Sequence, residues 1–310
     1  MRALITGATG FIGRRLVAEI AEPVVLSRNP QQAREKIPRA THHYWDPLTG
    51  PPPADAFAGV DAVFNLAGEP VGEGRWSATK KQRIRDSRVI GTRNLVLGIE
   101  ALDERPPVLV SASAIGYYGS RGDETLDESS PPARDFLAEV CREWETEARA
   151  AEKLGVRVAC TRFGIVLGEG GALAKMLLPF KLGAGGRLGN GRQWMSWIHI
   201  DDVVGILLAA AHEEQYRGPV NTVSPDPVTN REFTRVLAGV LHRPAIFPVP
   251  ALALRLAVGG FSEVLLGSQR VLPKVAQRAG YDFHYTSLAE ALRAVVEHRP
   301  AHAPTPAKVS

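Results

Sequence analysis

The residues Thr6–Gly13, Thr-Gly-Ala-Thr-Gly-Phe-Ile-Gly, constrain the fold of this chain more than any other segment. They follow the apolar run 3–5 and precede apolar residues at helical spacing: Phe11, Ile12, Leu16, Val17 and Ile20. This order predicts a strand, a tight glycine turn and a helix. Gly7 can adopt a positive φ, Gly10 leaves the backbone open to a phosphate group, and Gly13 lets the helix pack close to the strand.

The first amides of that helix are expected to point at a ligand lying over the turn. Unpaired N–H groups and the helix dipole favour negative charge at this end of a helix. The glycine spacing is G-x-x-G-x-x-G, one residue longer than the dinucleotide fingerprint G-x-G-x-x-G. Because the triplet follows a predicted strand directly, it indicates a dinucleotide site and not an ordinary loop.

The end of the second predicted strand bears on the choice of cofactor. Residues 24–26 form the strand, Ser27 and Arg28 follow it, and no Asp or Glu lies between Val24 and Asn29. A carboxylate here would bind the ribose 2′-hydroxyl of NAD, whereas an arginine pairs with a 2′-phosphate. The pattern favours NADP, with a solvated arginine at a strand end as the alternative.

Strand and helix patterns alternate along the first half of the chain. Strands are expected to end near 44–46 and to span 62–66, 108–110 and 157–161, with helices at 77–100 and 136–154. This alternation predicts an α/β fold with a doubly wound parallel sheet. Asp46 is a candidate contact for an adenine amino group, and Ala67 and Gly68 are small residues where a cofactor would cross the carboxyl edge.

The predicted helix 77–100 is rich in basic residues: Lys80, Lys81, Arg83, Arg85, Arg88 and Arg93. Most of them are expected to form a solvated face. One residue on the inner side, Arg83 or Arg88, is a candidate for binding the cofactor phosphates.

After Gly168 the sequence changes to glycine-rich loops and short, proline-containing helices. We expect a dinucleotide-binding domain at 1–168, to which part of 197–225 returns, and a substrate region at 169–298. This second region includes a C-terminal domain from about residue 245 and is expected to form the substrate pocket. The Pro/Ala/Lys-rich residues 299–310 predict a disordered tail.

The bulk properties exclude several classes of protein. The net charge is +4 and the sequence pI about 9.2. This small excess of basic residues is too spread out along the chain to indicate nucleic-acid binding, for which the helix 77–100 is the sole candidate face. Cys141 and Cys160 stand in no metal or redox spacing, so no metal is expected. The longest apolar stretch, Val203–Ala211, is about half of a bilayer span. A cytoplasmic protein without membrane contact, monomeric or homodimeric and acting on a small molecule, is therefore expected.

Several segments resemble the extended short-chain dehydrogenase/reductases, the NAD-dependent epimerase/dehydratase group. They are Thr6–Gly13, Asn65–Gly68, Ser113–Gly119, Arg162–Gly168 and Trp197–Asp202. Residues 65–70, 87–88, 178–180, 269–273 and 280–281 resemble more narrowly its "epimerase family protein" branch, which has a short C-terminal domain. Together with the turn, the resemblance implies cofactor contacts at Gly7, Thr9, Gly10, Phe11, Ile12, Ser27, Arg28, Leu66, Ala67, Gly68, Arg83, Arg88 and Val166.

The resemblance also shows a departure from the family's chemistry. The family uses a serine or threonine after the fifth strand and a Tyr-x-x-x-Lys pair on the next helix, in which tyrosine moves a proton and lysine holds the nicotinamide ribose. Ser113 stands at the serine position. The pair is missing, because Phe136 or Leu137 replaces the tyrosine and Val140 or Cys141 replaces the lysine.

Tyr117, on the loop after the fifth strand, can supply a phenol from another direction, or can pack against the cofactor. His199 resembles a structural residue of the family. The leading interpretation is an NADP-dependent oxidoreductase or epimerase-like enzyme acting on a small polar metabolite, with Ser113 and Tyr117 as catalytic residues. The alternative is an NADP(H)-binding regulator or sensor without turnover. No residue set favours a nucleotide-sugar epimerase in the strict sense.

Overall fold

The computed structural model describes residues 1–183 and 185–297, and a seven-stranded parallel sheet organises the first part of the chain. In spatial order the strands are β11 (Gly218–Thr222), β7 (Arg157–Phe163), β5 (Val108–Ala114), β4 (Ala62–Asn65), β1 (Arg2–Thr6), β2 (Glu22–Ser27) and β3 (Thr41–Tyr44). The predicted doubly wound sheet is thus confirmed.

The direction in which strands are added reverses between β1 and β4. From β1 the chain adds β2 and β3 on one side, and from β4 it adds β5, β7 and β11 on the other. Thr6 at the end of β1 pairs with Asn65 at the end of β4. In open parallel sheets such a switch point opens a crevice outside the carboxyl ends of the two strands.

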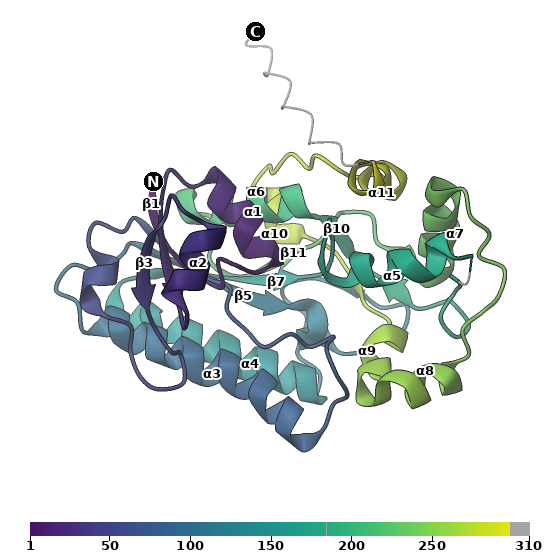
Figure 1. Ribbon diagram of the computed structural model, residues 1–310, viewed down its shortest axis with the longest axis horizontal. Helices are drawn as coiled ribbons and strands as arrows, with labels where there is room; N and C mark the ends of the chain where they lie inside the picture. The colour runs from purple at the N-terminus through teal and green to yellow at the C-terminus, as the bar shows by residue number, and fades with distance from the viewer. Residues whose placement is uncertain (184, 298–310) are drawn as a thin grey trace, which may run out of the picture.

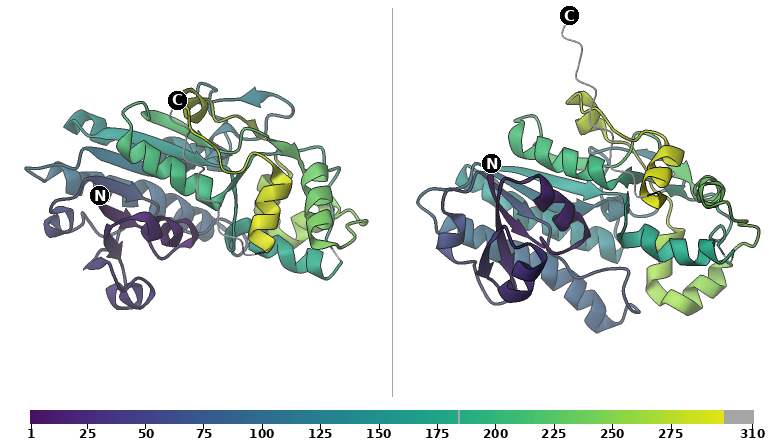
Figure 2. Two further views of the ribbon diagram at one scale, coloured as in Figure 1. Left: turned by 90° about the horizontal axis from the view of Figure 1, so that it is seen from above. Right: turned by 45° about the horizontal axis from the view of Figure 1, so that its top comes forward.

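Helices cover both faces of the sheet (Figures 1 and 2). One face packs α1 (Phe11–Glu19), α2 (Pro30–Lys36) and α6 (Ile200–His212), and the other packs α3 (Ala78–Glu100), α4 (Phe136–Arg149) and the 3-10 helix η3 (Ala150–Leu154). Because side chains alternate along a strand, Ile5 is buried in the first core and Leu4 in the second.

A third core lies beside the sheet. It contains residues from β8 (Ile165–Leu167), α5 (Gly171–Lys181), β10 (Trp197–His199), α7 (Asn230–Leu241) and α11 (Leu288–Val296). Figure 2 shows α7 and α11 side by side. The remaining elements are η1 (Ala54–Phe57), η2 (Ile115–Tyr118), β6 (Thr125–Leu126), β9 (Trp194–Met195), β12 (Val228–Thr229), α8 (Ala251–Val258), η4 (Gly259–Phe261), α9 (Ser262–Leu266), β13 (Arg270–Val271) and α10 (Lys274–Arg278).

The observed elements differ from the predicted ones mainly at their ends. The helix expected at 136–154 is α-helical only to Arg149 and continues as η3, and the third strand ends at Tyr44. The sequence did not indicate β11, which begins Gly-Pro. It is an edge strand of the sheet, where a proline is tolerated. The expected disordered tail, 299–310, lies outside the described residues.

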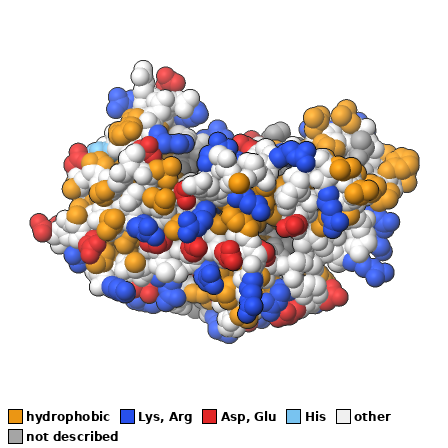
Figure 3. Space-filling model, turned by 90° about the horizontal axis from the view of Figure 1, so that it is seen from below, with side chains coloured by type: hydrophobic (Ala, Val, Ile, Leu, Met, Phe, Trp, Pro, Cys, Tyr) orange, Lys and Arg blue, Asp and Glu red, His pale blue; other side chains and the backbone are white. Residues whose placement is uncertain are grey.

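The basic side chains of α3 are partly neutralised by α4. Arg85 pairs with Glu143 at 2.8 Å and Arg93 with Glu147 at 2.6 Å. Figure 3 views the molecule from below, where these helices lie, and shows basic and acidic side chains interspersed. In the part of the chain that the structure describes, no helix is long and apolar enough to cross a membrane.

Candidate functional site

The turn between β1 and α1 requires glycine at two of its three glycine positions. Gly7 has φ +69°, and a Cβ there would lie 2.8 Å from the carbonyl carbon of Leu66. A Cβ on Gly13 would lie 2.3 Å from the Gly7 oxygen. Both distances are too short for a side chain, so these glycines let the helix, the turn and the end of β4 lie in contact.

Among the described residues, no side chain caps the first turn of α1 and no carboxylate stands in it. Gly10 is the N-cap residue and makes no side-chain cap, and the first turn contains no acidic residue. The φ of Gly10 is −75°, and its Cβ would meet only the Gly7 oxygen, at 3.1 Å. This helix end is therefore complementary to an external anion, because its dipole and N–H groups face the switch point without a partner.

A buried polar network fixes the segment after β4. The Thr6 hydroxyl accepts hydrogen bonds from the Leu66 and Ala67 amides at 3.1 and 3.0 Å. It donates to the Asn65 side chain at 2.9 Å, whose amide donates in turn to Thr92 on α3 at 2.8 Å. The side chains of β1, β4 and α3 thus hold one wall of the crevice rigidly.

Arg28 lies exposed just beyond β2, at the side of the crevice opposite β4. Within residues 1–183 and 185–297 its side chain makes no hydrogen bond or ion pair. The Ser27 hydroxyl accepts a bond from the Asn29 amide at 3.0 Å. The Asp46 carboxylate accepts one from the Leu48 amide at 3.0 Å in a turn. The contacts predicted for Arg28, Ser27 and Asp46 stay predictions.

The structure separates the two candidate arginines of α3. The Arg83 side chain is 63% exposed and its Nε lies 3.8 Å from a Glu69 carboxylate oxygen. The same oxygen accepts a 2.7 Å hydrogen bond from the buried Lys80 ammonium, and this bond lowers the pKa of Glu69. Arg88 instead turns inward and donates to the main-chain oxygens of Glu69 and Ile84, both at 3.0 Å. Only Arg88 therefore reaches the edge of β4.

The loop after β8 lies against the start of α1. The Phe11 ring occupies the space that a side chain on Gly168 or Gly170 would need, since a Cβ at either position would lie 2.6 Å from a ring atom. Val166, in β8, is partly buried beside this loop, and Thr9 and Ile12 are partly exposed in and after the turn. The predicted cofactor residues Gly7, Thr9, Gly10, Phe11, Ile12, Leu66, Ala67, Gly68, Arg88 and Val166 thus lie in or beside the β1–β4 edge.

A buried charge network lies at the ends of β5 and β7. Ser113 is 2% exposed and donates to a Glu145 carboxylate oxygen at 2.6 Å. Both carboxylate oxygens of Glu145 also accept from Arg162, at 2.7 Å each. Burial opposes the charge of Arg162, but the bonds to Glu145 outweigh it and raise the pKa of Arg162. In this arrangement Ser113 contacts protein and not solvent, so its catalytic role stays a prediction.

The network continues through two tyrosines. Arg162 donates to the Tyr118 hydroxyl at 2.8 Å, which donates to Asn221 on β11 at 2.7 Å. The Arg162 guanidinium carbon lies 3.5 Å from the centroid of the Tyr117 ring, which is partly exposed. Sequence reasoning missed Glu145 and the role of Arg162. The available signal was a glutamate on the apolar face of the 136–149 helix, four residues after Cys141.

At the positions where the family resemblance places the Tyr-x-x-x-Lys pair, α4 carries Phe136 or Leu137 and Val140 or Cys141. A Cβ on Gly116 would lie 3.4 Å from the Leu137 Cβ and 4.0 Å from the Cys141 sulfur. Burial raises the pKa of Cys141 to about 12, so the thiol stays neutral. The Phe136 ring packs edge-on against Trp76, with centroids 5.6 Å apart. Of these residues, Phe136 and Leu137 carry no titratable group, and Cys141 keeps its proton.

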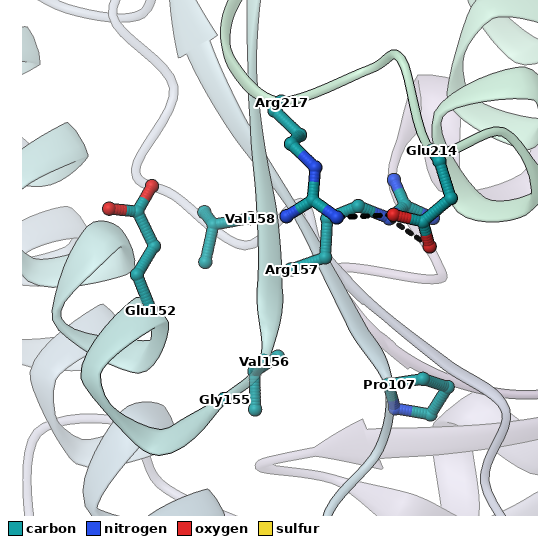
Figure 4. A pocket seen from close by; sticks show the side chains of 8 residues that line it. All are labelled: Pro107, Glu152, Gly155, Val156, Arg157, Val158, Glu214 and Arg217. Atoms are coloured by element: carbon teal, nitrogen blue, oxygen red, sulfur yellow. Dashed lines mark hydrogen bonds and ion pairs between the residues drawn. The ribbon is translucent and has the colours of Figure 1, made fainter.

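A cavity of about 610 Å³ lies at the opposite, amino end of β7 (Figure 4). Arg157 and Arg217 both point at Glu214 there, and Arg157 also donates to the Ala210 oxygen of α6 at 2.6 Å. These charges are already paired within the protein, and the cavity faces away from the switch point. Its chemistry is structural, since Arg157 binds the last carbonyls of a helix.

Two family models match the chain. One, described as the NAD dependent epimerase/dehydratase family, matches residues 3–222, which is more than half of the chain. The chain belongs to the NAD-dependent epimerase/dehydratase family. The second, a domain of unknown function (DUF1731), matches residues 249–295. The resemblance found in the sequence is thus confirmed.

The chain is similar over nearly its whole length to proteins called epimerase family proteins. It is 42% identical to the chloroplastic SDR39U1 homolog of Arabidopsis thaliana, covering 96% of this chain and 87% of that protein. It is 37% identical to YfhF of Bacillus subtilis, covering 96% and 99%. The crystal structure of human SDR39U1 (isoform 2) with NADPH is 33% identical, with a TM-score of 0.86, covering 96% and 99%.

Proposed function

We propose that this chain binds NADPH across the carboxyl ends of β2, β1 and β4 and acts as an oxidoreductase or epimerase-like enzyme on a small polar metabolite. The observation that carries the proposal is the N-terminus of α1. Its amides face the switch point with no capping side chain and no carboxylate in the first turn. A pyrophosphate would supply the missing negative charge.

The residues around the switch point fit a dinucleotide. The turn 7–13 would hold the pyrophosphate, and residues 66–68, whose amides are fixed by Thr6, would line its far side. Arg28 has an exposed side chain at the end of β2 and would pair with a 2′-phosphate. The NADPH in the human SDR39U1 structure supports this choice of cofactor.

A bound NADPH supplies a hydride, and this chain would supply orientation and a proton. Tyr117 is the candidate proton donor, because its ring is partly exposed and held on the Arg162 guanidinium. Ser113 would act on the substrate only indirectly, by fixing Glu145 and hence Arg162.

Residues 169–297 would cover the part of the crevice in which the substrate binds. Their core joins α5, α7 and α11, and a cavity of about 390 Å³ lies between them and the loop after η2. Residues from both parts line this cavity: Gly122, Asp123, Gly189, Asn190, Arg192, Gln193, Ala251, Leu266 and Ser268. Its volume is in the range of small-molecule sites. We propose 169–297 as the substrate-binding part on this basis.

A second candidate, an NADP(H) sensor without turnover, is favoured by one observation. The helix α4 carries Leu137 and Cys141 where the family's proton-transfer pair is expected, and Cys141 is buried and neutral. Such a protein would bind the cofactor with the same residues and would change its affinity for a partner.

The two candidates are separated by binding and turnover on the same protein. NADPH titration by calorimetry tests the site itself, and absence of binding would reject both candidates. Incubation with NADPH and a panel of carbonyl metabolites, followed by cofactor fluorescence, tests the reaction. Oxidation of NADPH that is lost in Tyr117→Phe supports the enzyme. Tight binding without oxidation across the panel supports the sensor.

A further inference from the structure

Residues 71–76, between β4 and α3, reach across the crevice to the part of the chain that follows residue 168. The Lys175 ammonium of α5 donates to the Gly72 main-chain oxygen at 2.8 Å. The Trp76 ring lies 5.9 Å from the Phe261 ring of η4, measured between centroids. In Figure 1 the loop that leads into α3 accordingly lies beside α9, which directly follows η4. We call residues 71–76 the strap, because they connect the two sides of the crevice.

The strap contacts the first part of the chain beside the proposed reaction site. The Trp76 ring packs on Phe136, the first residue of α4, with the centroids 5.6 Å apart. The next residue, Leu137, lies against η2, since its Cβ would be 3.4 Å from a Cβ on Gly116. Tyr117, the candidate proton donor, follows in η2. Three aromatic rings thus form a row from the start of α4, through Trp76, to η4.

Another contact joins the same two sides of the crevice at the end of β1. There the Phe11 ring fills the space beside the loop after β8, and a Cβ on Gly168 or Gly170 would lie 2.6 Å from a ring atom. This close packing makes the contact a fixed one. Phe11 follows β1, whereas the strap follows β4, so the two contacts bracket the carboxyl edge of these neighbouring strands.

The strap contact, by comparison, is light and rich in glycine. Trp76 and Phe261 are only partly buried, and neither η4 nor the preceding helix α8 contains a buried residue. Gly74 in the strap and Gly259 in η4 have φ values of +70° and +60°. Glycines let the backbone rotate at small cost, and segments with few buried apolar contacts open more easily than a core. Of the two contacts, the strap contact is therefore the one that can open while the fold persists.

The order of the strands indicates which part of a dinucleotide lies at the strap. Arg28 follows β2, the glycine turn follows β1 and the strap follows β4, and these strands are neighbours in that order. A cofactor with its 2′-phosphate at Arg28 and its pyrophosphate over the turn extends its nicotinamide half towards β4 and the strap. Its adenine half remains at β2, away from the strap.

We propose that the strap is a latch over the reaction site. The contact between Trp76 and Phe261 encloses the nicotinamide half of the cofactor together with the substrate, and it opens for either to enter or leave. This inference rests on the proposed function, because it assumes a dinucleotide in the crevice. The closed latch keeps water away from Tyr117 and the nicotinamide, and its opening sets the rate of cofactor exchange. A ligand confined to the adenine end needs no such opening.

A reversible crosslink across the latch tests this proposal on the full chain. A Cβ on Gly260 would lie 3.6 Å from the Trp76 Cβ, which is a separation that a disulfide spans. The double variant Trp76→Cys with Gly260→Cys therefore has a permanently closed latch when oxidised and no Trp76 ring when reduced. The native Cys141 and Cys160 are buried and do not compete for the new thiols. We expect NADPH association and dissociation, followed by stopped-flow fluorescence, to be at least about 10-fold slower in the oxidised form.

A cofactor fragment provides the matched control. The affinity for 2′-phospho-ADP, measured by calorimetry, should agree within about twofold between the oxidised and reduced forms, and this binding also shows that the variant is folded. Equal NADPH rates in the two forms would overturn the proposal. A loss of 2′-phospho-ADP affinity on oxidation would also overturn it, because closure would then act on the adenine end as well. Failure of the two cysteines to crosslink would do the same, because the strap and η4 would then not meet in solution.

A further pair of variants needs no crosslink. Phe261→Ala removes one ring of the latch and should speed NADPH dissociation about 3- to 10-fold, which is the effect of one aromatic contact. Phe247→Ala removes a 73% exposed ring from the same part of the chain and should change this rate by less than about twofold. An unchanged dissociation rate in Phe261→Ala would contradict the latch. Failure of the unaltered chain to bind NADPH would reject the proposed function itself, whereas binding at rates that do not depend on the strap would reject this inference alone.

Discussion

The two sides of the switch point satisfy their polar groups in opposite ways. At β1 and β2, the first-turn amides of α1 have no side-chain cap, and the Arg28 guanidinium has no protein partner among the described residues. At β5 and β7, Glu145, Arg162, Tyr118 and Asn221 bond to one another in a closed network. The donors on the first side are available to an anionic ligand, whereas the groups on the second side stabilise the protein itself.

This difference indicates which side of the switch point can contribute free energy to ligand binding. Unpaired donors gain most from a ligand, because no internal bond must first be broken. A closed network gains little from a ligand and instead fixes what stands on it, here the Tyr117 ring on Arg162. A change on one side should therefore alter affinity, and a change on the other should alter stability.

The largest expected effect comes from opening the closed network. Arg162→Met leaves the Glu145 carboxylate buried without its bidentate partner, which costs about 3 to 5 kcal/mol of unfolding free energy. Urea denaturation measures this loss. The double variant Glu145→Gln with Arg162→Met removes the stranded charge and should recover a large part of it. A loss below about 1 kcal/mol in the single variant would contradict the importance of the pair.

On the open side, Gly10→Asp should remove cofactor binding without harming the fold. An aspartate at the N-cap stabilises a helix, but its charge repels a phosphate at the same place. We expect the affinity for NADPH to fall about 100-fold, with an unchanged or raised melting temperature. Gly10→Asn, of nearly equal size and without charge, should bind more tightly than Gly10→Asp. If the two variants bind NADPH equally well, the loss of affinity at Gly10 comes from the size of the side chain and not from its charge.

Arg28→Asp sharpens the same comparison at the adenine end. The reversed charge removes the partner of a 2′-phosphate and offers an acceptor to a 2′-hydroxyl. The preference for NADPH over NADH should fall by about one to two orders of magnitude, measured as the ratio of the two dissociation constants. Arg34→Asp makes the same charge change on the exposed side of α2 and should leave the ratio unchanged. An unchanged ratio in Arg28→Asp would refute the assignment.

The smallest effect is expected at Ser113. Its hydroxyl gives Glu145 one of three hydrogen bonds, and Arg162 keeps the other two. Ser113→Ala should therefore lower the unfolding free energy by only about 1 kcal/mol and leave NADPH affinity unaltered. If NADPH oxidation is observed and Ser113→Ala abolishes it at unchanged stability, the hydroxyl acts on the substrate directly after all.

Local patterns were enough to predict much of the fold. The strand, glycine turn and helix at 3–20 and the long helix beginning after Ser77 follow from periodicity, glycine spacing and a capping residue. That residues 136–149 contain neither tyrosine nor lysine was also readable, because it is a matter of residue identity. By contrast, β11 has a Gly-Pro start and polar end residues, so nothing local distinguished it from a loop.

The sequence by itself determined which groups this chain has: a glycine turn with little side-chain bulk, an arginine after the second strand, and neither tyrosine nor lysine on α4. Only the tertiary structure decided which groups meet. Glu145 and Arg162 are 17 residues apart, and Ser113 and Glu145 are 32 residues apart. Packing of α3 against α4 also turned Arg88 inward and left Arg83 in solvent. Such pairings depend on how whole helices and strands pack, which residue spacing along the chain does not encode.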